Sequence, residues 1–158
     1  MSTIDYVELK GCSFVGVPFT QRLGGENTVP AEWDKCRASG VTDLLLGLSS
    51  RLFDNALLGW MGNYNADTKE FEYRIGVIIR GAAGQCLPPS CLLQPIPDCL
   101  LALGTIATGP RGAHAQNKRR YEQDGYELDW TKGFEVEYYE GEKGSGVFKY
   151  GSPVRKRG

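Results

Sequence analysis

The fold depends on one stretch near the end of the sequence, Phe134-Glu135-Val136-Glu137-Tyr138-Tyr139-Glu140. Its alternation is typical of a β-strand, in which successive side chains point to opposite faces of the sheet. One face is then apolar, and the other carries Glu135, Glu137 and Tyr139. A buried carboxylate loses hydration and needs a compensating partner, which can be water, an arginine or a cationic ligand. The function depends on which of these partners applies.

The composition indicates an ordinary globular domain. The chain has 158 residues, of which 41% are hydrophobic and 23% are charged, and its formal net charge at pH 7 is −1. This length is sufficient to bury a real core, so we expect a single domain over residues 1–158. The two basic clusters, at residues 118–120 and 155–157, are short. Nucleic-acid-binding proteins usually show a broader basic surface, which argues against a nucleic-acid partner.

The sequence shows neither a membrane segment nor a metal-binding pattern. No apolar run reaches the roughly 18 residues of a membrane span, and Met1–Asp5 lacks the features of a signal peptide. We therefore expect a cytoplasmic protein without a membrane partner. Five cysteines without C-x-x-C spacing and a single histidine, His114, do not form a zinc pattern. We expect reduced, mostly buried thiols, a surface histidine, and neither a metal nor a cofactor.

The expected elements follow the order strand, helix, strand, strand, linker, strand, helix, strand, strand. In the first half, residues 1–80, these are a strand over 6–20 that bends near Gly11, a helix capped by Thr28 and divided at Gly40, and strands over 57–64 and 70–80. The linker covers residues 81–97. In the second half, residues 98–142, they are a strand over 99–108, a helix over 113–124, and strands over 125–130 and 134–140. Residues 143–158 form a tail.

The clearest alternation in the chain lies between residues 70 and 80. Apolar side chains occupy every second position from Phe71 to Ile79, and charged side chains such as Glu72 and Arg74 occur between them. This pattern predicts a half-buried strand.

The two halves repeat the same order of elements although their residues differ. We therefore expect an α+β fold in which two strand-helix-strand-strand modules share an antiparallel sheet, with the helices on one side and a cleft on the other. Ligand sites commonly occur at such internal junctions. The architecture therefore predicts a ligand cleft between the halves.

Four segments, Val29–Trp33, Phe71–Val77, Pro95–Gly104 and Val136–Tyr139, resemble the GyrI-like small-molecule-binding domain in their order and spacing. This domain is also the effector-binding domain of bacterial multidrug-responsive regulators. The resemblance covers most of the chain and implies pseudo-twofold symmetry and an aromatic cleft with a carboxylate from the last strand. It also implies a bacterial origin and bulky, often cationic ligands. No helix-turn-helix region precedes the domain, so we expect a stand-alone version.

Carried onto this sequence, the resemblance assigns the carboxylate to Glu137, and a shift of two residues would assign it to Glu135. As an alternative, both glutamates form a solvated face of an edge strand and pair with Arg74 or Arg80. The aromatic candidates for the cleft wall are Trp33, Trp60, Tyr64, Tyr73 and Tyr139. Trp33 also fits a core position beside Cys36, and Tyr73 suits core or cleft equally well. Small neighbours would leave the ring of Trp60 accessible.

The chain also departs from the family pattern. Family members often have an aromatic residue in the fourth strand, where this chain has Leu100–Leu103, and tryptophans in the second helix, which are missing here. One wall of the cleft is therefore expected to be less aromatic.

The leading functional hypothesis is a module that binds amphipathic, aromatic and cationic small molecules, for sequestration or sensing. The alternative is a hydrolase that opens reactive ring compounds, with Glu137 as general base and Tyr139 as a second catalytic group. A protein partner is a third hypothesis, because the name-giving member of the family acts on a topoisomerase. We expect a monomer or a homodimer.

Overall fold

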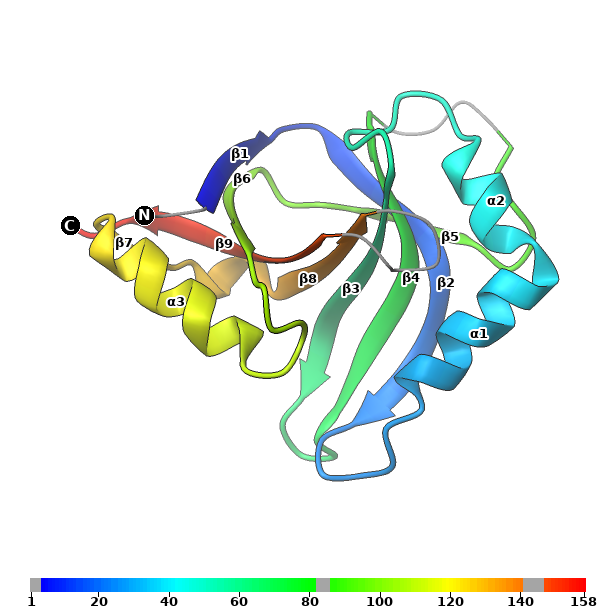
Figure 1. Cartoon of the computed structure of the whole chain (residues 1–158), viewed down its shortest axis with the longest axis horizontal. Helices are drawn as coiled ribbons and strands as arrows, with labels where there is room; N and C mark the ends of the chain where they lie inside the picture. Colours follow the sequence, from blue (N-terminus) through cyan, green and yellow to red (C-terminus); the bar gives the residue numbers. More distant parts are fainter. Residues whose placement is uncertain (1–3, 82–85, 141–146) are drawn as a thin grey trace.

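The structure of the chain, a computed structural model, describes residues 4–81, 86–140 and 147–158 (Figure 1). Within these ranges it contains nine strands, three α-helices and one 3-10 helix. In chain order they are β1 (Ile4–Leu9), β2 (Cys12–Arg22), α1 (Val29–Ser39), α2 (Val41–Leu46), β3 (Ala56–Asn65), β4 (Glu70–Arg80), β5 (Leu92–Pro95), β6 (Cys99–Thr105), α3 (Ala113–Gln123), β7 (Tyr126–Leu128), η1 (Trp130–Lys132), β8 (Phe134–Glu140) and β9 (Phe148–Lys156).

All nine strands form one curled antiparallel sheet in the order β1-β6-β9-β8-β3-β4-β2-β5, with β7 paired to β9. The order is symmetric about its centre, where β8 of one half pairs with β3 of the other. From this centre outward, β9, β6 and β1 on one side correspond to β4, β2 and β5 on the other. The short strands β1 and β5 each pair with a strand of the opposite half, β1 with β6 and β5 with β2. A pseudo-twofold axis therefore passes between β3 and β8. These pairings confirm the predicted duplicated α+β architecture.

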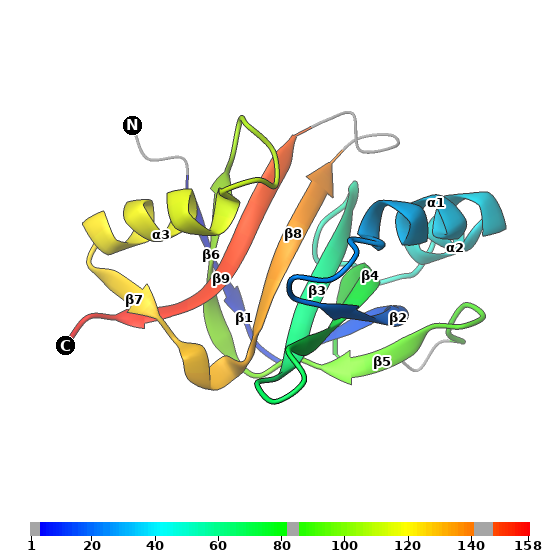
Figure 2. The same ribbon diagram turned by 90° about the horizontal axis from the view of Figure 1, so that it is seen from below.

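The helices lie on one face of the sheet, as expected. Figure 1 shows α3 on one side of the molecule and α1 with α2 on the other. Figure 2 shows β9, β8 and β3 side by side between these two groups of helices. Tyr73 and Ile75 of β4 pack in the same cluster as Trp33 of α1, and Ala102 of β6 packs against Tyr121 of α3. Both helical layers therefore cover the same face.

The opposite face of the sheet curls around a second core. Phe14, Leu58, Trp60, Leu101 and Val136 belong to this core, and each is at most 4% exposed. The predicted position of the cleft on this face is therefore wrong, because apolar side chains fill it. The open space lies on the helix face instead.

The curl also explains why β4 is not half-buried. Its residues from Tyr73 to Ile79 are all buried, including Arg74, which is 6% exposed. One face of β4 packs against α1 and α2, and Ile78 on the other face belongs to the second core. Alternation alone cannot reveal that the polar face will be covered by a curled sheet.

Two glycines divide the elements of the first half, as predicted. Gly11, with a φ of 63°, separates β1 from β2, and Gly40, with a φ of 83°, separates α1 from α2. The predicted capping of α1 by the Thr28 side chain is wrong, although the position of the cap is correct. Thr28 occupies the N-cap position without a capping hydrogen bond from its side chain, and its hydroxyl instead donates to Gln21 Oε1 at 3.0 Å.

Two strands lie where the sequence predicted none. β9 occupies the predicted tail and is a central strand between β6 and β8, so Phe134–Glu140 is not the last strand. Gly151 and Pro153 obscure the alternation of β9, because both residues are usually unfavourable inside a strand. β5 lies inside the predicted linker. Residues 82–85 of that linker and 143–146 of the tail lie outside the described residues.

The cysteines are free, as expected. Cys12, Cys36 and Cys91 are buried, Cys99 is half-buried and Cys86 is exposed. In the part of the chain that the structure describes, every helix is too short or too polar to span a membrane.

Candidate functional site

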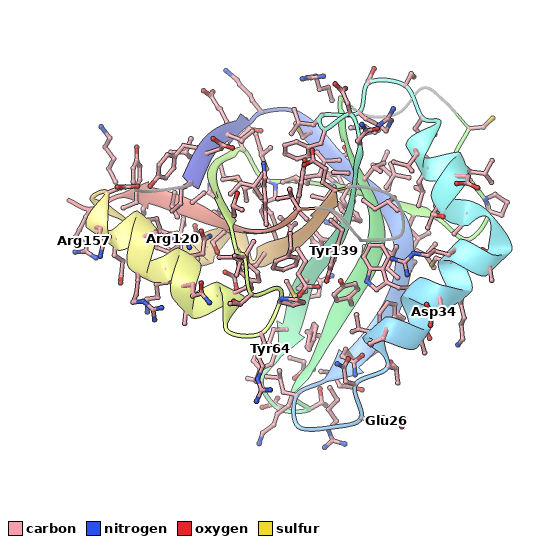
Figure 3. All side chains as sticks on the ribbon, in the orientation of Figure 1. Glu26, Asp34, Tyr64, Arg120, Tyr139 and Arg157 are labelled. Carbon is pink, nitrogen blue, oxygen red and sulfur yellow. The ribbon has the colours of Figure 1, made fainter. Side chains whose placement is uncertain are left out.

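A cavity of about 580 Å³ lies between α1 and the centre of the sheet. Its walls come from both halves of the fold, with Trp33 of α1 and Tyr73 of β4 facing Glu137 and Tyr139 of β8, and Pro110 of the β6–α3 loop completing the lining. In Figure 3, Tyr139 lies between α1 and α3. The volume is in the range of small-molecule pockets.

A chain of hydrogen bonds crosses this cavity and ends at Glu137. The indole N–H of Trp33 donates to the Tyr73 hydroxyl at 3.2 Å, and that hydroxyl donates to Glu137 Oε1 at 2.6 Å. The Tyr139 hydroxyl donates to the same oxygen at 3.2 Å. Among the described residues only these two hydroxyl groups donate to Glu137. Its second carboxylate oxygen, Oε2, therefore has no donor within this part of the chain.

Burial raises the pKa of Glu137, and the hydrogen bonds from Tyr73 and Tyr139 partly oppose this rise. The carboxylate is thus less well stabilised than it would be in water, because two neutral hydroxyl groups do not replace its full hydration. Burial also raises the pKa values of Tyr73 and Tyr139, and the negative charge of Glu137 raises them further. Both hydroxyl groups therefore remain protonated donors at neutral pH.

The hydrogen bond from Tyr73 to Glu137 is possible because residue 59 is a glycine and has no side chain. Gly59 of β3 pairs directly with Glu137 of β8, and a Cβ atom at position 59 would overlap with the Tyr73 hydroxyl. The ring of Tyr73 can therefore lie across Gly59 and reach the carboxylate. The sequence shows this glycine, but its significance depends on a strand pairing that the sequence does not reveal.

The cavity wall already contacts a cation of the chain itself. Trp33 and Tyr139 form an edge-to-face pair with ring centroids 5.1 Å apart. The guanidinium carbon of Arg37 lies 5.3 Å from the Trp33 ring centroid, and Arg37 Nη1 lies 3.7 Å from Asp34 Oδ1. Arg37 and Asp34 were not among the site residues predicted from the sequence. The spacing of Trp33 and Arg37, four residues apart on one helix, is the signal that could have found the contact.

Glu135 lies on the same face of β8 as Glu137 but has different partners. It accepts hydrogen bonds from the hydroxyl groups of Tyr150, at 3.1 Å, and Ser152, and its Oε2 lies 2.9 Å from His114 Nδ1. The hydrogen bond to Glu135 raises the pKa of His114. His114 was expected to be a surface residue, and it is exposed. Its carboxylate partner Glu135 was not predicted from the sequence, nor were Tyr150 and Ser152, the two residues of β9 that donate to Glu135.

The alternative in which both glutamates form a solvated edge with an arginine is wrong. β8 is a central strand, Arg74 pairs with Glu72, and Arg80 donates to the Arg51 carbonyl oxygen at 3.3 Å.

The remaining aromatic candidates lie outside this cavity. Trp60 is one position from Gly59 and therefore faces the second core, where it is 4% exposed, stacks on Phe134 and contacts the Arg74 guanidinium. The expected accessibility of its ring is wrong, because the curled sheet covers that face. Tyr64 is 54% exposed and lines an adjoining cavity together with Glu135.

The hydrogen bond from Tyr73 allows a direct test of the electrostatics. In Tyr73→Phe, the pKa of Glu137 is expected to rise further, because a donor that favours the charged carboxylate is lost. An NMR titration of the Glu137 carboxyl carbon measures this pKa. Tyr150→Phe, which removes a hydroxyl from Glu135, is the matched control and should leave the pKa of Glu137 nearly unchanged. An unchanged or lower pKa in Tyr73→Phe would contradict the described hydrogen bonding.

Within residues 4–81, 86–140 and 147–158, no group of three or more acidic, histidine or cysteine side chains is placed to hold a metal ion.

Comparisons with known proteins identify the fold. The sequence matches no family model and no curated protein. Among solved structures, SAV2435 bound to tetraphenylphosphonium is similar at 14% identity and a TM-score of 0.68, over 96% of this chain and 93% of that one. A bacterial protein of Staphylococcus aureus MU50 has 14% identity and a TM-score of 0.65 over the full length of both chains. The EcmrR C-terminal domain has 15% identity and a TM-score of 0.57 over 99% of both. At these identities the similarity shows a shared fold.

Proposed function

We propose that this chain is a GyrI-like binding module that takes amphipathic, aromatic cations into the cavity between α1 and β8, for sequestration or sensing. The observation that carries the proposal is the environment of Glu137. Its carboxylate lines an aromatic cavity, burial raises its pKa, and Oε2 lacks a donor among the described residues. A cation in the cavity would supply the missing partner.

The aromatic wall adds to this attraction. A cation over a well-placed aromatic face gains about 0.5 to 2 kcal/mol, with the larger values where water is excluded. Trp33, Tyr73 and Tyr139 all line the cavity, and Arg37 already occupies a cation–π position over Trp33. Such a wall favours flat or bulky cations without requiring a specific pattern of hydrogen bonds, which supports broad ligand choice.

The fold neighbours support the same class of ligand. One of them, SAV2435, was solved with tetraphenylphosphonium, a lipophilic cation with four phenyl rings. Together with the GyrI-like resemblance of four sequence segments, this makes tetraphenylphosphonium a suitable first probe.

The geometry supports binding better than hydrolysis. Glu137 Oε2 lacks a donor among the described residues and could accept a proton from a water molecule. A ring-opening reaction also needs a proton for the leaving group. The hydroxyl groups of Tyr73 and Tyr139 both donate to Glu137, and burial raises their pKa values, so neither is a ready acid.

The test is calorimetric titration with tetraphenylphosphonium between about pH 5 and about pH 8. The affinity is expected to fall as the pH decreases toward the raised pKa of Glu137, because protonation removes the charge that attracts the cation. The trend should persist in His114→Gln, which removes the neighbouring histidine with a raised pKa. Triphenylphosphine oxide, a neutral analogue, should bind more weakly and without this pH dependence. Equal, pH-independent binding of both compounds would contradict the proposal.

A further inference from the structure

We infer that the chain has a second cation-binding subsite beside the first, so that it takes elongated molecules that carry an aromatic cation at each end. The inference rests on the proposed function of the first cavity.

The second subsite is a cavity of about 480 Å³ near the end of the β3–β4 hairpin. Leu23, Met61 and Phe71 line both this cavity and the first one, so the two cavities adjoin through a shared apolar wall. In Figure 3, Tyr64 lies toward the end of the β3–β4 hairpin and Tyr139 lies further along the sheet. A long ligand that crosses this shared wall would reach both cavities.

Exposed aromatic and apolar side chains gather at this cavity. Trp130 is 73% exposed, Tyr64 is 54% exposed and Leu23 is 53% exposed, and all three line it. They are half of the six large hydrophobic side chains that are exposed within the described residues. Exposed apolar surface that is concentrated at one concave place commonly marks a binding site.

The backbone at Trp130 is anchored by the turn that begins at Asp129. Asp129 accepts a hydrogen bond from the Thr131 hydroxyl, and its backbone N–H donates to the Pro153 carbonyl oxygen at 2.8 Å. The turn is thereby tied to β9, a central strand of the sheet. The exposed indole therefore extends from a well-anchored segment at the edge of the second cavity.

The charge of the lining favours a cation. Asp129 and Glu135 both line the second cavity, and its lining among the described residues contains no lysine, arginine or histidine. The basic partners of these carboxylates stand outside the lining, with Arg155 Nη1 3.9 Å from Asp129 Oδ1 and His114 Nδ1 2.9 Å from Glu135 Oε2. An aromatic wall beside two carboxylates suits a lipophilic cation and disfavours an anion.

The two subsites are spaced for one ligand. Glu135 and Glu137 are two residues apart on β8 and share a face, which places their backbone positions about 7 Å apart. When two cationic groups are joined by a linker that spans the sites, binding of the second group becomes intramolecular and its effective concentration rises. A bis-cation should therefore bind more tightly than either half alone.

The three tryptophans report separately on the two subsites. Trp33 lines the first cavity, Trp130 lines the second, and Trp60 is buried in the core on the opposite face. Their indole N–H resonances can be followed by NMR while the protein is titrated with decylquinolinium or with bis-quinolinium compounds whose linkers hold about 6 to 12 methylene groups. The monocation is expected to shift Trp33 first, whereas a bis-cation of matching length shifts Trp33 and Trp130 together. Trp60, which lines neither cavity, should shift least.

Variants then test whether Trp130 contributes to affinity. Trp130→Ala is expected to weaken bis-cation binding about 3- to 30-fold and to leave decylquinolinium binding unchanged. Leu92→Ala removes another exposed apolar side chain, 52% exposed on β5, and is the matched control that should have no effect.

The outcomes separate the two claims. If decylquinolinium binds at Trp33 but bis-cations gain no affinity and leave Trp130 unshifted, the second subsite is wrong and the proposed function stands. If neither compound shifts Trp33, the proposed function is wrong. If a bis-cation shifts Trp130 but not Trp33, the inference that one ligand occupies both cavities is wrong.

Discussion

Glu137→Gln is expected to weaken the binding of tetraphenylphosphonium about 30-fold, which corresponds to about 2 kcal/mol. Glutamine keeps the size of the side chain and can still accept hydrogen bonds from Tyr73 and Tyr139 at its carbonyl oxygen. It loses the charge, so the cation no longer gains the electrostatic compensation of the Glu137 carboxylate when it leaves water. Binding of the neutral triphenylphosphine oxide should remain within about twofold of wild type, because aromatic contacts are retained.

Glu140→Gln is the matched control for this experiment. Glu140 ends the same strand, accepts a hydrogen bond from Tyr138 at 3.1 Å and does not line the cavity. Its replacement should leave the affinity for the cation unchanged.

Protein stability provides a second control on the Glu137 variant. The folded-state pKa of Glu137 is raised, so the charged form is disfavoured by folding, and the carboxylate lowers stability as the pH rises through that pKa. Glu137→Gln should therefore unfold at an equal or higher urea concentration than wild type at neutral pH. A large loss of stability would mean that weaker binding reflects misfolding and would count against the electrostatic account.

Gly76→Ala is expected to destabilise the protein by about 3 kcal/mol or more. Gly76 of β4 pairs directly with Gly16 of β2, and a Cβ atom at position 76 would overlap with the Val15 carbonyl oxygen and lie 2.6 Å from the Gly16 Cα. Both obstacles are backbone atoms of the paired strand. The sheet cannot relieve the overlap by rotating a side chain, and separating β2 from β4 would break the ladder that supports the cavity.

Urea unfolding followed by circular dichroism measures this effect. Gly25→Ala is the control, because the nearest atoms to its added Cβ lie 3.4 Å away, and its free energy of unfolding should stay within about 0.5 kcal/mol of wild type. If Gly76→Ala unfolds at the same urea concentration as wild type, the close contact between β2 and β4 does not exclude a side chain at position 76.

The sequence could predict most elements where a local pattern determines them. The alternation of residues 134–140 predicted both the strand and the shared face of Glu135 and Glu137, because the period of a strand is a local property. β9 was missed because Gly151 and Pro153 break its pattern, while its long-range pairing with β6 and β8 stabilises it as a strand. Tertiary pairing of this kind leaves no local signal.

The candidate site was predictable only in part for the same reason. Glu137 and Glu135 look equivalent in sequence, and only the packing of α3 and β9 gives Glu135 its partners His114 and Ser152. Trp60 and Gly59 are neighbours on opposite faces of β3, and which of the two faces the cavity depends on how β3 pairs with β8. The cavity therefore follows from register and curl, which single-sequence patterns do not specify.

The most direct test of cation binding at Glu137 is anomalous X-ray diffraction from crystals soaked with tetraphenylarsonium, in which arsenic marks the position of the cation. The account predicts an arsenic peak in the cavity lined by Trp33, Tyr139 and Glu137, with much lower occupancy in Glu137→Gln crystals soaked at the same concentration. A peak outside this cavity, or equal occupancy in both proteins, would contradict it.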